Sequence, residues 1–215
     1  MPVAPVFLAS LDNSDRRDLP YRHWLLENML PDDTCAEIDA LPVEPPAIED
    51  TFGKRETNNG SRLFFNAEQI GAHRVCADVA HGFQSSGVVR RLSEECGVDL
   101  EGSSLRIEYC LDTDGFWLEP HTDIGAKLFT MLVYLSDDSG TELWGTDLYD
   151  GPTKWVGTSP YRRNSGLIFV PAANTWHGFR KRKITGVRRS LIVNYVKPEW
   201  RSRHELAFPD TPVSG

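Results

Sequence analysis

The stretch RRSLIVNYV, residues 188–196, is the clearest strand in the sequence. Successive side chains of a strand point to opposite faces, so the alternation predicts one polar and one apolar face. The polar face carries Arg188, Ser190, Ile192 and Asn194, and the apolar face carries Leu191, Val193 and Tyr195. An arginine on an inward strand face is costly unless it meets a carboxylate, which it can grip with two hydrogen bonds. The stretch therefore predicts a β core with an anion-binding residue inside it.

Further short apolar runs precede this strand in the second half of the chain. They are SLRIEYCL (104–111), KLFTMLVYL (127–135), TELWG (141–145), KWVGT (154–158) and GLIFV (166–170). The runs are rich in β-branched and aromatic residues, and turn-forming stretches such as DTDG, SDDSG and RRNSG separate them. Several short strands divided by turns predict a sandwich or a closed barrel.

The first hundred residues show mainly helical rather than strand-like patterns. Helical patterns cover residues 32–41, 67–83 and 85–96, and Gly97 is a plausible C-terminal cap of the last one. Residues 1–19 suggest a loose lead-in, residues 42–60 a long loop, and PYRHWLLENML (20–30) fits a strand or a helix. We expect a single α+β domain: a mostly helical part over residues 1–100 packed outside a β core at 101–200, and a tail at 201–215.

Composition narrows the class of protein. The chain has 215 residues, 40% of them hydrophobic and 25% charged, and no apolar run near the ~20 residues that a membrane helix needs. The first residues lack the basic start and apolar stretch of a signal peptide. The four cysteines, Cys35, Cys76, Cys96 and Cys110, form no C-x-x-C pair and suggest reduced thiols. We expect a protein of the cytoplasm with no membrane segment.

Charge is unevenly distributed. The net charge is -8, yet residues 151–204 hold twelve Lys and Arg residues against the single acid Glu199. The acidic total and the lack of interleaved aromatic residues argue against nucleic-acid binding. Two interpretations remain for the basic segment: a solvated turn, or a region that attracts a small anionic substrate.

Two histidines and an aspartate stand near the ends of the expected strands. His121 and Asp123 occur in EPHTDIGAK (119–127), and His177 follows 56 residues later in VPAANTWHGF (170–179). Two imidazoles and one carboxylate are the donors of the facial triad of non-haem iron, and the absence of thiolates argues against structural zinc. The chemistry of these residues predicts a metal site with open positions.

The order His121-x-Asp123, His177, Arg188-x-Ser190 resembles the 2-oxoglutarate and Fe(II)-dependent oxygenase superfamily, in particular its prolyl 4-hydroxylase-like branch. The likeness covers residues 104–197 and implies a double-stranded β-helix, a cupin-like jelly roll. It implies that His121, Asp123 and His177 bind iron, and that Arg188 binds the distal carboxylate of 2-oxoglutarate with help from Ser190. It also makes Tyr134, and less directly Tyr109, candidates for contacting that carboxylate.

The activity implied by the resemblance is dioxygenation: a small molecule or peptide side chain is hydroxylated with O2, and succinate and CO2 are released. Fe(II) and 2-oxoglutarate are the implied cofactors, and a need for ascorbate stays open. Two alternatives are a cupin-like metal-dependent isomerase and a non-catalytic jelly-roll binding protein. Phe116, Trp117 and Asn194 either line a substrate pocket or simply pack. The remaining histidines, which we expect to be structural or solvent-facing, are His23, His73, His81 and His204. The oligomeric state is not predicted.

Overall fold

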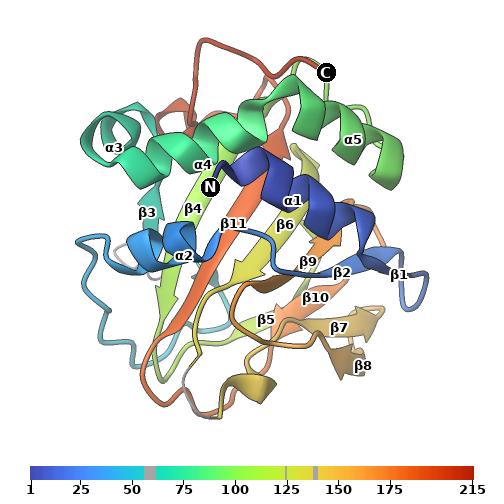
Figure 1. Cartoon of the computed structure of the whole chain (residues 1–215). Helices are drawn as coiled ribbons and strands as arrows, with labels where there is room; N and C mark the ends of the chain where they lie inside the picture. Colours follow the sequence, from blue (N-terminus) through green and yellow to red (C-terminus); the bar gives the residue numbers. More distant parts are fainter. Residues whose placement is uncertain (56–61, 124, 138–139) are drawn as a thin grey trace.

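Two antiparallel sheets face each other in the protein, and helices cover the outer face of the larger sheet (Figure 1). The computed structural model describes residues 1–55, 62–123, 125–137 and 140–215. The larger sheet has the order β1 (Asp15–Arg17), β2 (His23–Glu27), β9 (Ser165–Phe169), β6 (Lys127–Tyr134), β11 (Arg188–Val196), β4 (Ser104–Asp112) and β3 (Arg62–Phe64). The smaller sheet has the order β5 (Leu118–His121), β10 (His177–Phe179), β7 (Asp147–Asp150) and β8 (Lys154–Thr158). The expected double-stranded β-helix is confirmed.

Hydrophobic residues form two separate cores. The helices are α1 (Val3–Asp12), α2 (Asp32–Asp39), α3 (Ala67–Ala72), α4 (Arg74–Gln84) and α5 (Ser86–Cys96), with short 3-10 turns η2 (Thr141–Leu143) and η3 (Arg203–Glu205). One core lies between the helices and the larger sheet and includes Phe7 and Phe83. The other lies between the sheets and includes Leu167 and Phe179. The helices thus bury one face of the larger sheet and leave its inner face for the site.

Strand β11 occupies the interior of the larger sheet and divides the two cores. It pairs with β4 along its whole length and with β6 from Ser190 onward. Leu191 and Val193 belong to the helix-side core, whereas Ile192 belongs to the core between the sheets. The alternation read from the sequence is confirmed, because each face of the strand meets a different apolar layer.

The N-terminal lead-in is ordered, contrary to expectation. Residues 3–12 form α1, whose buried side chains Val3, Phe7 and Leu11 recur every four residues and pack in the helix-side core. The ambiguous stretch 20–30 contains strand β2, and the helix expected at 67–83 is two helices that meet at His73, whose backbone is extended. Gly97 has φ 67°, the left-handed conformation of a helix cap, as predicted.

One strand prediction in the second half was wrong, and some short strands there were not predicted. TELWG is not a strand, because residues 141–143 form the 3-10 turn η2, and the strand of this region is β7 at 147–150. Strands β5 and β10 were not expected, since four and three residues are too short to show a periodicity. The expected loop at 42–60 contains no helix or strand over residues 42–54, and residues 56–60 lie outside the described ranges.

Ion pairs within the fold compensate part of the uneven charge distribution of the sequence. Basic side chains of residues 151–204 meet acidic ones from elsewhere, in the pairs Arg162–Glu27, Arg163–Asp39, Lys181–Asp50, Arg182–Asp147 and Arg188–Asp112. Much of the positive charge of this segment is therefore compensated within the fold. All four cysteines are buried and free. Among the described helices, none has the length and apolar character needed to cross a membrane.

Candidate metal centre and its pocket

The pairing of two short strands brings the two histidines together. His121 ends β5 and His177 begins β10, and the two residues are directly opposite in the antiparallel register. Their ring centroids lie 4.4 Å apart. Asp123 follows two residues after His121, and one ligand atom from each of these three residues lies within 4.8 Å of the others.

Backbone carbonyls fix the tautomer of both rings. Nδ1 of His121 lies 2.8 Å from the carbonyl oxygen of Glu119, and Nδ1 of His177 lies 3.0 Å from that of Thr175. A carbonyl only accepts, so each Nδ1 carries the proton and each Nε2 keeps its lone pair. Burial lowers the pKa of His177 to about 4, against the opposing charge of Asp123. This ring is therefore neutral at pH 7, as a metal ligand must be.

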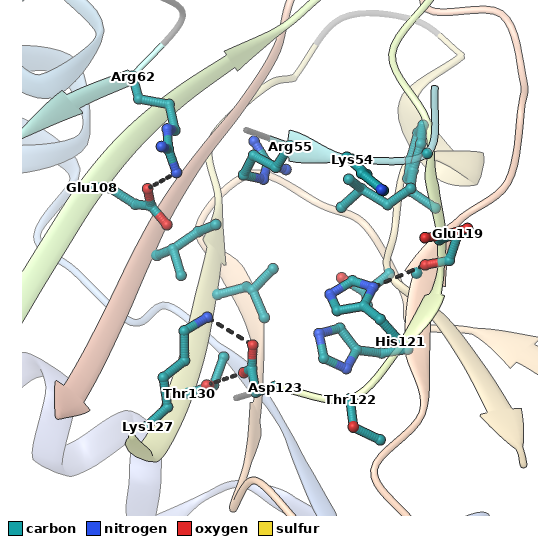
Figure 2. A pocket seen from close by; sticks show the side chains of 18 of the residues that line it. Lys54, Arg55, Arg62, Glu108, Glu119, His121, Thr122, Asp123, Lys127 and Thr130 are labelled. Carbon is teal, nitrogen blue, oxygen red and sulfur yellow. Dashed lines mark hydrogen bonds and ion pairs between the residues drawn. The ribbon is translucent and has the colours of Figure 1, made fainter. Parts of the chain in front are cut away.

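Asp123 is ionised and held at both oxygens. Thr130 donates to its Oδ2 over 2.6 Å, and the ammonium of Lys127 lies 2.7 Å from its Oδ1 (Figure 2). Burial would raise the pKa of Asp123, but the charge of Lys127 and the two hydrogen bonds outweigh it and lower the pKa below its usual range. Two imidazole nitrogens and one carboxylate fit a divalent transition metal such as iron(II).

Arg188 lies on the inner face of the larger sheet, at the opposite end of the pocket from the triad. It is 2% exposed and sits opposite Asp112 in the register of β11 and β4, with Nη1 2.6 Å from Asp112 Oδ2. Its Nε donates to the carbonyl of Trp144 over 2.7 Å. Arg55 binds Asp112 as well, at 3.0 Å. Two guanidinium groups thus share one carboxylate, which leaves this end of the pocket positively charged.

Ser190 lies one pleat away from Arg188 and is fully buried. Its hydroxyl has no hydrogen-bond partner among the described residues. Leaving a buried hydroxyl unpaired costs about 1–3 kcal/mol, so such a group needs an explanation. A carboxylate placed beside Arg188 would accept a bond from it, and the residues present therefore fit one end of a dicarboxylate.

The two tyrosines named by the resemblance are placed differently. The hydroxyl of Tyr134 is engaged with Thr146 Oγ1 at 2.8 Å and Ser159 Oγ at 2.7 Å. Tyr134 therefore stands behind Thr146, which lines the pocket. Tyr109 points to the opposite face of β4 and belongs to the helix-side core. The expected contact of Tyr109 with a carboxylate in the pocket is not supported by this geometry.

Phe116, Trp117 and Asn194, the three candidate pocket residues, differ in their positions relative to the cavity. Phe116 lines the pocket, whereas Trp117 donates from its indole nitrogen to Asp50 at the side of it. Asn194 is 0% exposed and forms hydrogen bonds in the sheet, so it lies behind the wall rather than in it.

A single cavity of about 450 Å³ contains the triad and Arg188. Beyond the triad it ends in a charged wall, which is formed by Arg62, Arg106, Glu108 and Glu205 together with the ring of Trp200. Figure 2 shows Arg62 and Glu108 of this wall. Of the twelve basic residues in 151–204, Arg188 is the one that lines the cavity; the other cations there come from earlier in the chain.

Sequence reasoning missed this charged wall. The alternating Arg106 and Glu108 within an otherwise apolar predicted strand were a usable signal, because both fall on one face. Trp200 is the last residue of the expected core and Glu205 lies in the expected tail, and neither gave such a signal.

Comparisons with known proteins agree on the fold. A prolyl hydroxylase from Trichoplax adhaerens, solved with a hypoxia-inducible factor peptide, has a TM-score of 0.56 and 14% identity over 93% of this chain and 91% of that one. A Pseudomonas putida prolyl-4-hydroxylase has a TM-score of 0.55 and 14% identity over 91% and 98%. A 2OG-Fe(II) oxygenase family oxidoreductase from Burkholderia pseudomallei has a TM-score of 0.56 and 15% identity over 81% and 84%.

Sequence comparison gave no further relative. No protein-family model matches the chain, and no curated protein matches it by sequence. At identities this low the solved structures establish the fold, which is that of the prolyl hydroxylases and related oxygenases. Fold and donor set together define a jelly-roll protein with a candidate two-histidine, one-carboxylate metal centre.

Proposed function

We propose that the protein is a 2-oxoglutarate- and Fe(II)-dependent dioxygenase that hydroxylates a peptide side chain or a small molecule. The observation that carries this proposal is the coexistence, in one cavity, of the triad His121, Asp123 and His177 with Arg188. A metal site alone would not need a buried guanidinium. Arg188 and the hydroxyl of Ser190, which has no partner among the residues that the structure describes, together form a binding site for the distal carboxylate of a keto acid.

The side chains of the cavity would have three different roles: binding the metal, orienting the keto acid and excluding water. His121, Asp123 and His177 would hold the metal, which together with 2-oxoglutarate supplies the oxidising chemistry. The Nδ1 bonds of the two histidines to carbonyls keep Nε2 directed into the site. Arg188 and Ser190 orient the keto acid, and the apolar side chains of Leu132, Phe179 and Ile192 line the space between them and keep water out.

Local charge favours a dianionic cosubstrate. Arg55, Asp112 and Arg188 carry a net charge of +1, and they lie out of bulk water. A buried cation without a full counter-charge is unfavourable, so a carboxylate at this end improves the balance. The metal would compensate the other carboxylate of the keto acid. A cupin-like isomerase or a non-catalytic module gives no reason for this arrangement.

The substrate class is inferred more coarsely. The Trichoplax prolyl hydroxylase was solved with a peptide, and the cavity here continues past the triad to the charged wall. We therefore propose a peptide or small molecule as substrate, with polar groups that can meet that wall. The four buried free cysteines suit a reducing compartment, and we propose a cytoplasmic location.

Succinate release tests the proposal. Purified protein with Fe(II), O2, 2-oxoglutarate and ascorbate should convert 2-oxoglutarate to succinate slowly without substrate and faster when a panel of peptides and small molecules includes an acceptor. Asp123→Ala should abolish both rates, because it removes one of three metal ligands. An Asp123→Ala variant that forms succinate at the wild-type rate would refute the triad. A wild type that binds iron but never consumes 2-oxoglutarate would favour a metal-dependent isomerase.

A further inference from the structure

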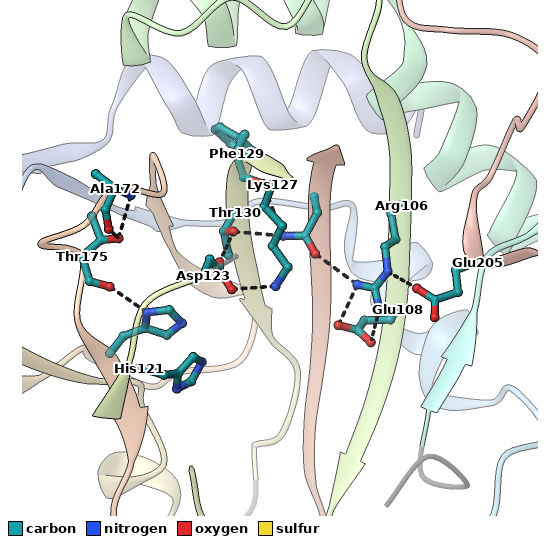
Figure 3. Close-up of polar contacts among 12 residues, drawn as sticks. Arg106, Glu108, His121, Asp123, Lys127, Phe129, Thr130, Ala172, Thr175 and Glu205 are labelled. Carbon is teal, nitrogen blue, oxygen red and sulfur yellow. Dashed lines mark hydrogen bonds and ion pairs between the residues drawn. The ribbon is translucent and has the colours of Figure 1, made fainter. Parts of the chain in front are cut away.

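A continuous row of hydrogen bonds runs from the candidate metal ligand Asp123 across the larger sheet. Thr130, Asn194 and Arg106 lie on adjacent strands β6, β11 and β4, and the register places them directly side by side. Thr130 donates to Asp123 over 2.6 Å, Asn194 donates to Thr130 over 3.0 Å, and Arg106 donates to Asn194 over 3.1 Å (Figure 3).

The direction of every bond in this row is determined by its ends. The carboxylate of Asp123 only accepts, so the hydroxyl of Thr130 must donate to it. The hydroxyl oxygen then accepts from Nδ2 of Asn194, which turns Oδ1 of the amide toward Arg106, a group that only donates. No member can reverse without leaving a buried group unpaired, so the row has one low-energy arrangement.

Arg106 anchors the far end of the row. Both oxygens of Glu108 accept from its Nη atoms at 3.0 and 3.1 Å, and Glu205 of the C-terminal segment accepts from its Nε at 2.6 Å. The rings of Phe64 and Trp200 lie 4.9 and 5.3 Å from the guanidinium. The guanidinium is thus held by residues of β3, β4 and the C-terminal segment.

We propose that Thr130, Asn194 and Arg106 are positioning residues that hold the Asp123 carboxylate turned toward the two histidines, with Glu205 bracing the row from the C-terminal segment. The inference rests on the proposed function only in requiring that the triad binds a metal. Without its hydrogen bond from Thr130, the carboxylate of Asp123 can rotate away from the two histidines. Metal binding by all three residues must then stop this rotation, which makes the free energy of metal binding less favourable. Residues that orient metal ligands typically contribute 10–100-fold to metal affinity.

Manganese(II) binding to the metal-free protein tests the first link. Thr130→Val keeps the shape of the side chain and removes the hydroxyl, and we expect the dissociation constant for Mn(II) to rise about 10–100-fold. Thr130→Ser restores the donor and should recover most of the affinity. Thr158→Val is the matched control, because Thr158 Oγ1 donates to Asp147 over the same 2.6 Å but outside the cavity. The control should lower stability without weakening Mn(II).

The second link needs variants further from the metal. Asn194→Ala should weaken Mn(II) binding, and the double variant Thr130→Val/Asn194→Ala should be no weaker than Thr130→Val alone, because Asn194 acts through Thr130. Tyr195→Phe removes a buried hydrogen bond on the opposite face of the same strand and should leave the affinity unchanged. Glu205→Gln, at the edge of the cavity, is a mild variant that keeps the fold and should cause a smaller loss.

The outcomes separate the inference from the proposed function. Unchanged Mn(II) affinity in both Thr130→Val and Asn194→Ala would overturn the inference and leave the oxygenase proposal standing. Wild-type protein that binds Mn(II) but not 2-oxoglutarate would overturn the proposed function, while losses confined to the row would still support the inference. An equal loss in Thr158→Val would show that stability alone is measured, and would overturn the positioning role.

Discussion

The two carboxylate oxygens of Asp123 contact different kinds of groups. The neutral hydroxyl of Thr130 donates a hydrogen bond to Oδ2, whereas the charged ammonium of Lys127 contacts Oδ1. The first contact can persist when a metal binds, but an ammonium and a divalent cation compete for the same oxygen. Lys127 is therefore a counter-ion for the metal-free carboxylate.

Lys127→Met should strengthen Mn(II) binding several-fold. The variant keeps a long apolar side chain and removes both the competitor for Oδ1 and a positive charge near the metal. Lys127→Arg, which keeps the charge, serves as the control and should bind Mn(II) about as the wild type does. Weaker binding in Lys127→Met would mean that the ammonium supports the site instead.

Arg188→Ala should raise the concentration of 2-oxoglutarate needed for half-saturation by about 10–100-fold, since a charge-assisted hydrogen bond contributes about 1.5–3 kcal/mol. Mn(II) affinity should change little, because Arg188 touches none of the three ligands. Removing it also leaves Asp112 paired with Arg55 alone, so a lower melting temperature is expected. Equal 2-oxoglutarate affinity in variant and wild type would contradict the assigned role.

Among individual residues, the sequence singled out those that carry distinctive chemistry. His121, Asp123 and His177 stood out because their donor types and order are uncommon together. Asn194 was noticed for its strand face and as a candidate pocket residue, whereas no role was predicted for its partners Thr130 and Arg106. Their link depends on the register of three strands that are far apart in the sequence, which no local pattern encodes.

Strand β4 is unusual among the elements because charged side chains follow its inner face. Arg106, Glu108 and Asp112 alternate there and are all buried. Burial alone would raise the pKa of Glu108, but the charges of Arg106 and Arg62 outweigh it and lower the pKa to about 2. Buried charges survive only when they are paired, and here each has a partner.

The pH dependence of unfolding should report on Glu108. Its pKa is lowered from the usual 4.5 to about 2 in the folded state, so its contribution is complete above pH 4.5 and is lost as the pH falls toward 2. The contribution is on the order of 3 kcal/mol. Urea unfolding should show wild type losing stability between pH 4.5 and 2 and Glu108→Gln losing less. The control Glu37→Gln, on the exposed side of α2, should follow the wild type. Parallel curves for all three proteins would contradict this role.

Element prediction succeeded where a period could be counted. The strands β4, β6, β8, β9 and β11 and the helices α2 and α5 were expected near their observed positions. Strands β5 and β10 were missed because each exists mainly through its partner, and α1 was missed because a short N-terminal helix gains its stability from packing against α4 and α5.

Across the whole molecule the two cores have different tasks. The helix-side core is apolar and fixes the larger sheet, while the space between the sheets mixes apolar side chains with the triad, Arg188 and the buried charges. The fold class was predictable from strand spacing and from the resemblance. The position of the charged wall was not, because it needs the C-terminal segment to return beside β4, as the contact of Leu206 with Arg106 shows.

Binding of 2-oxoglutarate, measured by calorimetry without O2, is the most direct test of the proposed site. In that site His121, Asp123 and His177 would hold a metal, and Arg188 would hold the far carboxylate of a keto acid. We expect 2-oxoglutarate to bind wild-type protein loaded with Mn(II), and to bind neither the metal-free protein nor Asp123→Ala. Equal binding with and without metal, or undiminished binding by Asp123→Ala, would contradict the account.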